Sequence, residues 1–131
     1  AMDCYEEAVA YAGTRIQFDK PIAAYQLTQQ KLAEMLNEIT KAQFMTYQLG
    51  RLKDQGRLTH QQVSLSKMNN VRMALEIARS ARTILGASGI THEYVSMRHA
   101  ANLESVLTYE GTHEMHTLVV GEAITGIPAY R

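Results

Sequence analysis

The 131-residue sequence contains one cysteine, two prolines and no tryptophan. A single cysteine, Cys4, excludes an internal disulfide and suits a reducing compartment. No motif surrounds it, so we expect a plain core or surface thiol. An excess of charge is missing as well, because 13 Lys and Arg residues balance 13 Asp and Glu residues. The sequence therefore gives no electrostatic reason to expect a nucleic-acid partner or attachment to a membrane surface.

Long apolar runs are also lacking. The longest uncharged ones, such as residues 117–121, are far too short to span a bilayer. Residues 1–5 have neither the basic region nor the apolar region of a signal peptide, so no targeting segment is predicted. Residues 6–11 already have the pattern of a helix interior, from which we expect the chain to start partway into a longer structure.

Apolar residues make up 46% of the chain, enough for a core, and they recur by threes and fours. This spacing predicts helices over residues 3–16, 25–55, about 60–85 and 112–123, with a shorter helix or irregular segment at 97–107. No segment alternates with period two for long enough to predict a strand. The two longest helices are about twice the usual length, which favours an antiparallel arrangement. The predicted fold is a single all-α domain over residues 1–131, an antiparallel up-and-down bundle of four to five helices.

The third predicted helix has two apolar faces, so we expect it to be buried between neighbours. The first face comprises Met68, Val71, Leu75, Ala78 and Leu85, and the second Met73, Ile77, Ala81 and Ile84. In the last helix, the positions expected to face inward are Met115, Leu118, Val119 and Ala123.

Residues 14–22, followed by Gln26, form the first of three segments that could carry chemistry. Arg15 lies where the first helix ends, beside Phe18 and Pro21. Its side chain could simply cap the last carbonyls of that helix. It could instead bind an anion, since a guanidinium makes paired hydrogen bonds to phosphate.

The second segment is the glycine-containing turn at residues 83–90. Gly86 and Gly89 could serve only to end the third helix. Alternatively, backbone without side chains could let a flat or phosphorylated ligand approach closely.

The third segment, residues 109–116, places Glu110 directly before Gly111 and Thr112 at the predicted start of the last helix. The carboxylate could be a capping charge that complements the helix dipole. It could also be a general base, because a carboxylate shielded from water has a raised pKa and can take a proton from an acidified carbon.

The same segment contains residues spaced in a way that is similar to two kinds of metal site. His113 and His116 are one residue too close for the zinc motif HExxH. Glu110 and His113 have the Glu-x-x-His spacing of di-iron bundles, but that site needs a second copy, and none of Glu38, Glu76, Glu93 and Glu104 is followed by His at the third position. No metal site is predicted.

In this order, the three segments resemble the acyl-CoA dehydrogenase family. Its C-terminal domain carries Arg-x-Gln-Phe-x-x-Pro-Ile, then a Leu-Gly-Gly-x-Gly turn and finally Tyr-Glu-Gly-Thr. Here these are Arg15-Ile16-Gln17-Phe18 with Pro21-Ile22, Leu85-Gly86-Ala87-Ser88-Gly89 and Tyr109-Glu110-Gly111-Thr112. The resemblance covers essentially all 131 residues. Within the family, residues 49–55, 98–104 and 124–127, together with Thr108 and His113, look most like the glutaryl-CoA dehydrogenase branch.

The resemblance implies an FAD-dependent enzyme that removes hydrogens from the α and β carbons of an acyl-CoA thioester. Glu110 matches the catalytic base, while Tyr109 and Gly111 match substrate-binding residues. Arg15 and Gln26 match FAD contacts made across a subunit interface, with Arg15 on the pyrophosphate. The remaining positions that match FAD contacts are Phe18, Thr83, Ile84, Leu85, Gly86, Ala87, Thr112, Glu114 and Tyr130.

In the glutaryl branch, the resemblance implies conversion of glutaryl-CoA to crotonyl-CoA with decarboxylation. It also implies a homotetramer, an electron-transfer flavoprotein as electron acceptor, and a location in bacterial cytoplasm or the mitochondrial matrix. Two alternatives stay open, namely another short-chain acyl-CoA dehydrogenase and a helical oligomerisation or interaction module without activity of its own.

Three departures from the family pattern limit what the resemblance implies. Ala87 replaces the second glycine of the turn, and Thr83 occupies a position that is often Gln. The family also has an N-terminal helical domain and a middle β-domain, which supply much of the flavin and CoA sites and are absent from these 131 residues. We therefore expect the 131-residue polypeptide alone to have negligible dehydrogenase activity.

Overall fold

The computed structural model describes residues 1–130, which form five α-helices joined by short connections. The helices are α1 (Met2–Thr14), α2 (Gln26–Asp54), α3 (His60–Leu85), α4 (Ser96–Thr108) and α5 (His113–Thr125). Between α1 and α2 lie a hairpin of β1 (Ile16–Gln17) and β2 (Lys20–Pro21) and a 3-10 turn, η1 (Ile22–Ala24). A second 3-10 segment, η2 (Gly86–Ile90), follows α3.

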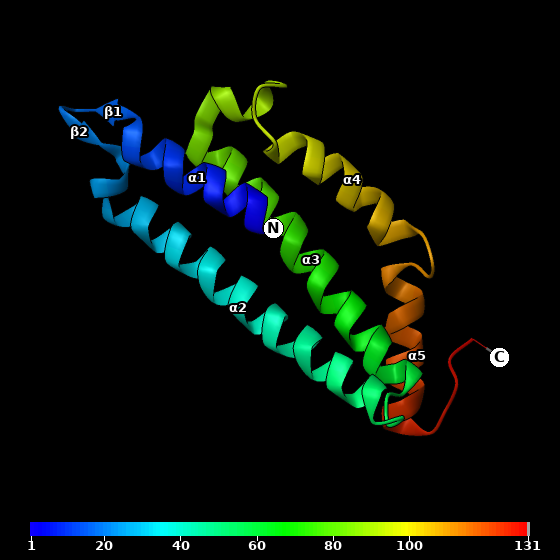
Figure 1. Ribbon diagram of the computed structural model, residues 1–131. Coiled ribbons are helices and arrows are strands. Elements are labelled where there is room, and N and C mark those ends of the chain that lie inside the picture. Colours follow the sequence, from blue (N-terminus) through cyan, green and yellow to red (C-terminus); the bar gives the residue numbers. More distant parts are fainter. Residues whose placement is uncertain (131) are drawn as a thin grey trace.

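The helices form an antiparallel bundle around α3 (Figure 1). The long helices α2 and α3 run antiparallel to each other, and α1 runs parallel to α3 beside its C-terminal half. On the other side of α3, α4 and α5 follow one another in series, both antiparallel to it. The predicted all-α bundle is therefore confirmed, with α4 and α5 sharing one side of the central helix.

Helix α3 is the centre of the core, as its two apolar faces predict. Its buried residues include Val71, Leu75, Ala78 and Leu85 from the first face and Ile77, Ala81 and Ile84 from the second, while Met68 and Met73 are half-buried. Helix α1 packs on it through Cys4, Ala8 and Ala12, none of which has exposed surface. Small side chains at this contact allow the two backbones to lie close together, and burial of a side chain such as Leu85 contributes about 1.5–3 kcal/mol.

Two local features differ from the sequence expectation. Helix α1 ends at Thr14 rather than residue 16, and a hairpin pairs Ile16 with Pro21 and Gln17 with Lys20. Phe18 and Asp19 at its turn have φ of 50° and 65°, the pair of left-handed residues that a type I′ hairpin turn requires. Strands of two residues are too short to show any alternation, which is why the sequence pattern did not predict them.

The inward face predicted for α5 is partly wrong. Leu118 and Val119 are half-buried, but Met115 and Ala123 are exposed. The reason is that α5 packs chiefly against one neighbour, α3, so only a narrow arc of its surface is covered. No residue of α5 is fully buried.

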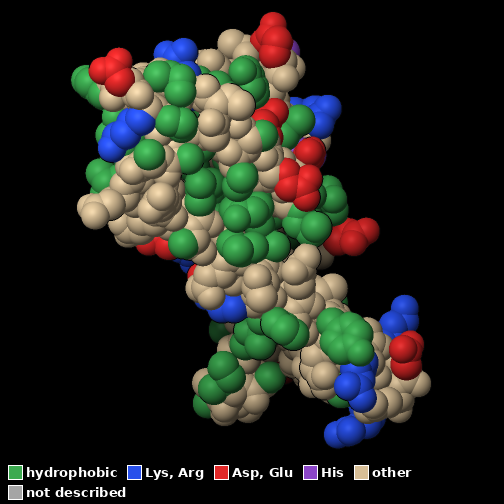
Figure 2. Space-filling view, turned by 60° about the vertical axis from the view of Figure 1, so that its left-hand side comes forward, with side chains coloured by type: hydrophobic (Ala, Val, Ile, Leu, Met, Phe, Trp, Pro, Cys, Tyr) green, Lys and Arg blue, Asp and Glu red, His purple; other side chains and the backbone are tan. Residues whose placement is uncertain are grey.

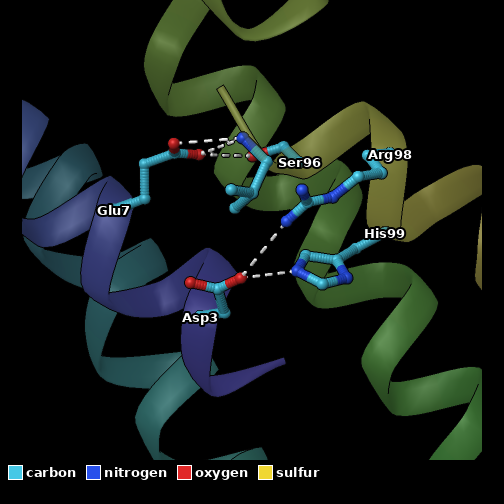
Figure 3. A network of polar contacts seen from close by, with 6 residues as sticks. Asp3, Glu7, Ser96, Arg98 and His99 are labelled. Atoms are coloured by element: carbon cyan, nitrogen blue, oxygen red, sulfur yellow. Dashed lines mark hydrogen bonds and ion pairs between the residues drawn. The ribbon is translucent and has the colours of Figure 1, made fainter. Parts of the chain in front are cut away.

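A polar network ties α1 to the start of α4 (Figure 3). The carboxylate of Glu7 accepts the backbone N–H of Val95 at 3.0 Å, and the fully buried Ser96 hydroxyl donates to it at 3.4 Å. Nearby, Asp3 Oδ2 lies 2.6 Å from His99 Nε2 and 3.9 Å from the Arg98 guanidinium. These contacts fix the position of α4, which leads directly to the segment carrying Glu110. Within residues 1–130, no helix is both long enough and apolar enough to cross a membrane.

Candidate active site

Most of the residues predicted to contact a cofactor or substrate fall into two separate groups. One group surrounds the C-terminal end of α3, and the other is the connection between α4 and α5. The α3 residues beside the two groups, Thr83 and Lys67, are separated by about 24 Å along the helix at ~1.5 Å per residue. A single copy of the domain therefore does not bring the two groups into one cavity.

The first group lines a cavity of about 430 Å³, here called the Arg15 cavity. The predicted residues Arg15, Thr83, Ile84, Leu85, Gly86 and Ala87 all line it, together with Tyr11, Gln17, Ile22 and Ser88. One wall comes from the end of α1 and the hairpin, and the other from the end of α3 and η2. Segments about 70 positions apart in the sequence thus meet at one cavity.

Arg15 is the C-cap residue of α1, but its side chain does not cap the last carbonyls of the helix. The carbonyls of Ala10 and Tyr11 accept from the Thr14 hydroxyl, both at 3.2 Å, and Tyr11 also accepts the backbone N–H of Arg15. Within residues 1–130, the Arg15 guanidinium makes no hydrogen bond or ion pair. It is exposed at the edge of the cavity, where its five N–H donors remain available to an anion.

The turn after α3 does end the helix and also forms the cavity wall. Gly86 is the C-cap residue, and Ala87 is exposed, so its methyl group is accommodated. Gly89 is the position that excludes a side chain, because a Cβ there would lie 2.7 Å from the Arg82 carbonyl oxygen. The Thr83 hydroxyl donates to the Arg79 carbonyl at 2.9 Å within α3.

Three other predicted cofactor residues lie outside both the Arg15 cavity and residues 109–116. Phe18 is at the hairpin tip and 89% exposed, and Gln26 is the first residue of α2, also exposed. Tyr130 lies near the start of α3, where its hydroxyl donates to Glu122 at 3.0 Å beside His60 and Val119.

The second group forms the loop between α4 and α5, here called the Glu110 loop (residues 109–112). Tyr109 is the C-cap of α4, and Thr112 is the N-cap of α5. Between them, Glu110 has φ of 53° and Gly111 has φ of 93°. A left-handed Glu is uncommon, and it turns the chain sharply between the end of α4 and the start of α5. Glu110 is exposed and makes no hydrogen bond or ion pair within residues 1–130, so these residues do not shield it from water.

The capping role considered for Glu110 is filled by its neighbours. The Thr112 hydroxyl accepts the backbone N–H of Met115 at 3.3 Å. Glu114 supplies the acidic charge of the first turn of α5, and hydrogen bonds from its own backbone N–H and from the Thr112 side chain lower its pKa. Glu110 lies two residues before the N-cap and is not needed for it.

Lys67 and His116, which sequence reasoning did not select, hold the Glu110 loop from beneath. The Lys67 ammonium on α3 donates to the carbonyls of Tyr109 and Gly111, the latter at 2.6 Å. His116 Nδ1 lies 3.0 Å from the Ser64 hydroxyl of α3, and its ring lies under Gly111, where a Cβ would be 2.9 Å from His116 Nε2. The sequence does contain one sign of this role for Lys67. A charged residue between Ser64 and Val71 lies on a helix face that is otherwise buried, so it needs a partner there.

Comparison with known proteins identifies the domain. Residues 1–125 match the acyl-CoA dehydrogenase C-terminal domain. The chain belongs to the acyl-CoA dehydrogenase family. It is similar to the crystal structure of glutaryl-CoA dehydrogenase from Mycobacterium smegmatis, with 64% identity, a TM-score of 0.96 and coverage of 98% of this chain and 33% of that one.

Two further relatives bear on cofactor and substrate. A glutaryl-CoA dehydrogenase from M. smegmatis in complex with FADH2 is 55% identical, with a TM-score of 0.95, over 98% of this chain and 33% of that one. A 3-(aryl)acrylate reductase from Clostridium sporogenes is 32% identical over 92% of this chain and 32% of its own length. The 131 residues thus span about a third of the length of the relatives they match.

Proposed function

We propose that this domain works within an FAD-dependent acyl-CoA dehydrogenase in which Glu110 is the base that removes the α proton. The observation that carries the proposal is the position of Glu110, held in a left-handed turn with its carboxylate unpaired while Thr112 and Glu114 take the capping roles. The thioester acidifies the α carbon, so a carboxylate held beside it can take that proton while the β hydrogen leaves as hydride. A carbon–carbon double bond forms between the two positions.

The residues of the Arg15 cavity fit the diphosphate and adenosine portion of FAD. The cavity combines an unpaired guanidinium with backbone and small side chains at residues 86–88, which suit a phosphate beside a flat group. Bound FAD supplies the hydride acceptor. This chain's residues would bind and orient it, with Arg15 on the diphosphate and Phe18, Gln26, Thr112, Glu114 and Tyr130 as the remaining proposed contacts.

The separation between the Arg15 cavity and the Glu110 loop supports a site shared between copies of the chain. One FAD would then meet Arg15 and Gln26 of one copy and the Glu110 loop of another, as the family resemblance implies. The expected assembly is a homotetramer. The exposed apolar side chains on α2, at 48–73% exposure, favour such burial between copies. They are Leu27, Leu36, Phe44 and Tyr47.

We further propose glutaryl-CoA as the substrate. The 64% identity to a glutaryl-CoA dehydrogenase supports this choice over other acyl-CoA substrates. After dehydrogenation, loss of the distal carboxylate as CO2 and protonation at the γ carbon give crotonyl-CoA. The acceptor that reoxidises the flavin would be an electron-transfer flavoprotein, and the expected compartment is the bacterial cytoplasm or mitochondrial matrix.

A second candidate role is a helical interaction module without its own catalysis. Hydrophobic side chains reach the surface in a broad band across the middle of the face shown in Figure 2, which favours a partner there. Sedimentation of the 131-residue polypeptide, with measurement of bound FAD, separates the roles. Multimers without flavin would favour the interaction module. Negligible dehydrogenase activity is expected from this polypeptide alone in either case.

The test of the proposed base is Glu110→Gln in the full-length flavoprotein. The amide keeps the shape and cannot accept the proton, so we expect flavin reduction by glutaryl-CoA to slow by about 100- to 10,000-fold with FAD still bound. Glu93→Gln, at an exposed carboxylate outside both groups, is the control and should leave the rate unchanged. A near-normal rate in Glu110→Gln would show that another group is the base.

A further inference from the structure

We infer that Lys67 is a positioning residue for Glu110, fixing the catalytic loop through the backbone carbonyls of Tyr109 and Gly111, the residues before and after the base. The inference rests on the proposed function, because it assigns Lys67 a role in proton abstraction by Glu110. Lys67 belongs to α3 and lies 43 positions before Glu110 in the sequence, outside all three segments that resemble the family.

The contact between Lys67 and the Glu110 loop involves one ammonium group and two backbone carbonyls. Lys67 Nζ donates to Tyr109 O, directly before Glu110, and to Gly111 O, directly after it, at 2.6 Å. An ammonium has three donors and no acceptor, so it can hold both carbonyls at once. Both hydrogen bonds involve a charged donor and are therefore stronger than neutral ones. The direction in which the Glu110 side chain leaves the backbone is set between these two fixed peptides.

The conformation of the loop explains why such a clamp is needed. Glu110 at φ 53° and Gly111 at φ 93° are two consecutive left-handed residues, and a residue with a Cβ is disfavoured there. A strained backbone persists only where its surroundings determine it. Lys67 on α3 holds the carbonyls of Tyr109 and Gly111, and the His116 ring, hydrogen-bonded to Ser64 of α3, packs under Gly111.

The position of Glu110 is well defined because Lys67, which binds its loop, belongs to the central helix α3. Lys67 is itself half-buried, and Ser64, Ser66 and Val71 around it on the helix are buried. The lysine therefore extends from the most tightly packed helix rather than from another loop. Although Glu110 lies on a loop, its position is fixed relative to a core helix. Proton transfer needs such precision, because it occurs only over hydrogen-bond distance.

A purely structural role would be to complement the C-terminal end of α4, where Tyr109 is the C-cap. The two roles have different consequences. Loss of a helix cap lowers stability and leaves the chemical step of the folded enzyme as it was. Loss of positioning slows α-proton abstraction in enzyme that is folded and carries its flavin.

The experiment uses the full-length flavoprotein with FAD bound, and measures flavin reduction by saturating glutaryl-CoA in the absence of oxygen. We expect Lys67→Met to slow reduction by about 10- to 100-fold, because small misplacements of a reacting group have effects of this size. The deuterium isotope effect with α-deuterated substrate should rise, while KM and FAD content stay close to those of the parent. Lys67→Arg keeps charged donors and should recover most of the rate.

The controls separate the possible failures. Lys53→Met, at an exposed lysine near the end of α2, should match the parent. If Lys67→Met reduces its flavin at the parental rate while Glu110→Gln is inactive, the positioning role is wrong and the base assignment stands. If Glu110→Gln is itself active, the proposed function fails. Should Lys67→Met lose FAD or unfold, Lys67→Gln decides, since a folded, flavin-bearing Lys67→Gln at the parental rate would equally overturn the inference.

Discussion

The side chain of Glu7 on α1 caps the N-terminus of α4, 88 positions further along the chain. Its two carboxylate oxygens lie 3.0 and 3.1 Å from the backbone nitrogen of Val95, the N-cap residue, whose own side chain offers no cap. The N-terminal N–H of α4 is thus hydrogen-bonded by a residue of another helix rather than by a local capping side chain. The orientation of α4 therefore depends on where α1 lies (Figure 3).

This relationship predicts that Glu7→Ala destabilises the domain. The change leaves the Val95 backbone N–H and the Ser96 hydroxyl without their acceptor, and loss of a helix cap costs about 1–2 kcal/mol. Urea unfolding followed by circular dichroism measures the free energy of unfolding. The matched control is Glu6→Ala, whose side chain is exposed, and which should change stability by less than about 0.5 kcal/mol. Equal effects of the two substitutions would contradict the capping role.

The pair of Asp3 and His99 predicts a pH dependence at the acid end. The hydrogen bond from the His99 ring lowers the pKa of Asp3 below its ordinary value. A lowered folded-state pKa means that the contribution to stability is present above the ordinary Asp value of about 3.9 and is lost as pH falls through the lower, folded value.

Asp3→Asn removes this proton linkage. Its stability should therefore fall less steeply than that of the parent as the pH is lowered from about 5 to about 3. The measurement is urea unfolding at a series of pH values, with Glu6→Gln as control at an exposed acid of the same helix. Identical slopes for Asp3→Asn and the parent would show that the contact does not persist in solution.

We expect replacement of glycine by alanine to have opposite effects on stability at Gly111 and at Gly50. Gly111→Ala places a Cβ 2.9 Å from His116 Nε2 on backbone at φ 93°, so we expect a loss of about 1–3 kcal/mol. Gly50→Ala, within α2 and with nothing within 4 Å of the new Cβ, should gain about 0.5–1 kcal/mol from helix propensity. Thermal unfolding of both variants checks the pair. A neutral Gly111→Ala would show that the loop relaxes without strain.

The sequence predicted the helices well because their signals are local. The threes-and-fours spacing through Val71, Leu75 and Ala78 and the glycine at position 86 mark α3 to within a residue or so of its ends. Tertiary effects were harder to predict. The hairpin at residues 16–21 is too short for a periodic signal, and the exposure of Met115 depends on how many neighbours α5 has.

The candidate site was predictable where residues resemble a family motif, and less so elsewhere. Arg15 and residues 83–87 belong to two separate motifs that match FAD contacts in the family, and the fold brings them to one cavity. The sequence also allows Glu110 to be a capping charge, and in the structure Thr112 is the N-cap residue. Lys67 carries no motif, and its importance comes from three-dimensional contact with carbonyls, groups that no side-chain pattern describes.

The unequal packing of the helices has a consequence for motion. Every other helix packs on α3, whereas α5 has no buried residue and α4 has only Ser96. Amide protons in the middle of α3 should therefore exchange with solvent deuterium only through global unfolding, and those of α5 through local opening. Equal protection in the two helices would contradict this ranking. Glu110 lies between α4 and α5, the two loosely packed helices, and the hydrogen bonds from Lys67 join its loop to α3, the helix expected to open last.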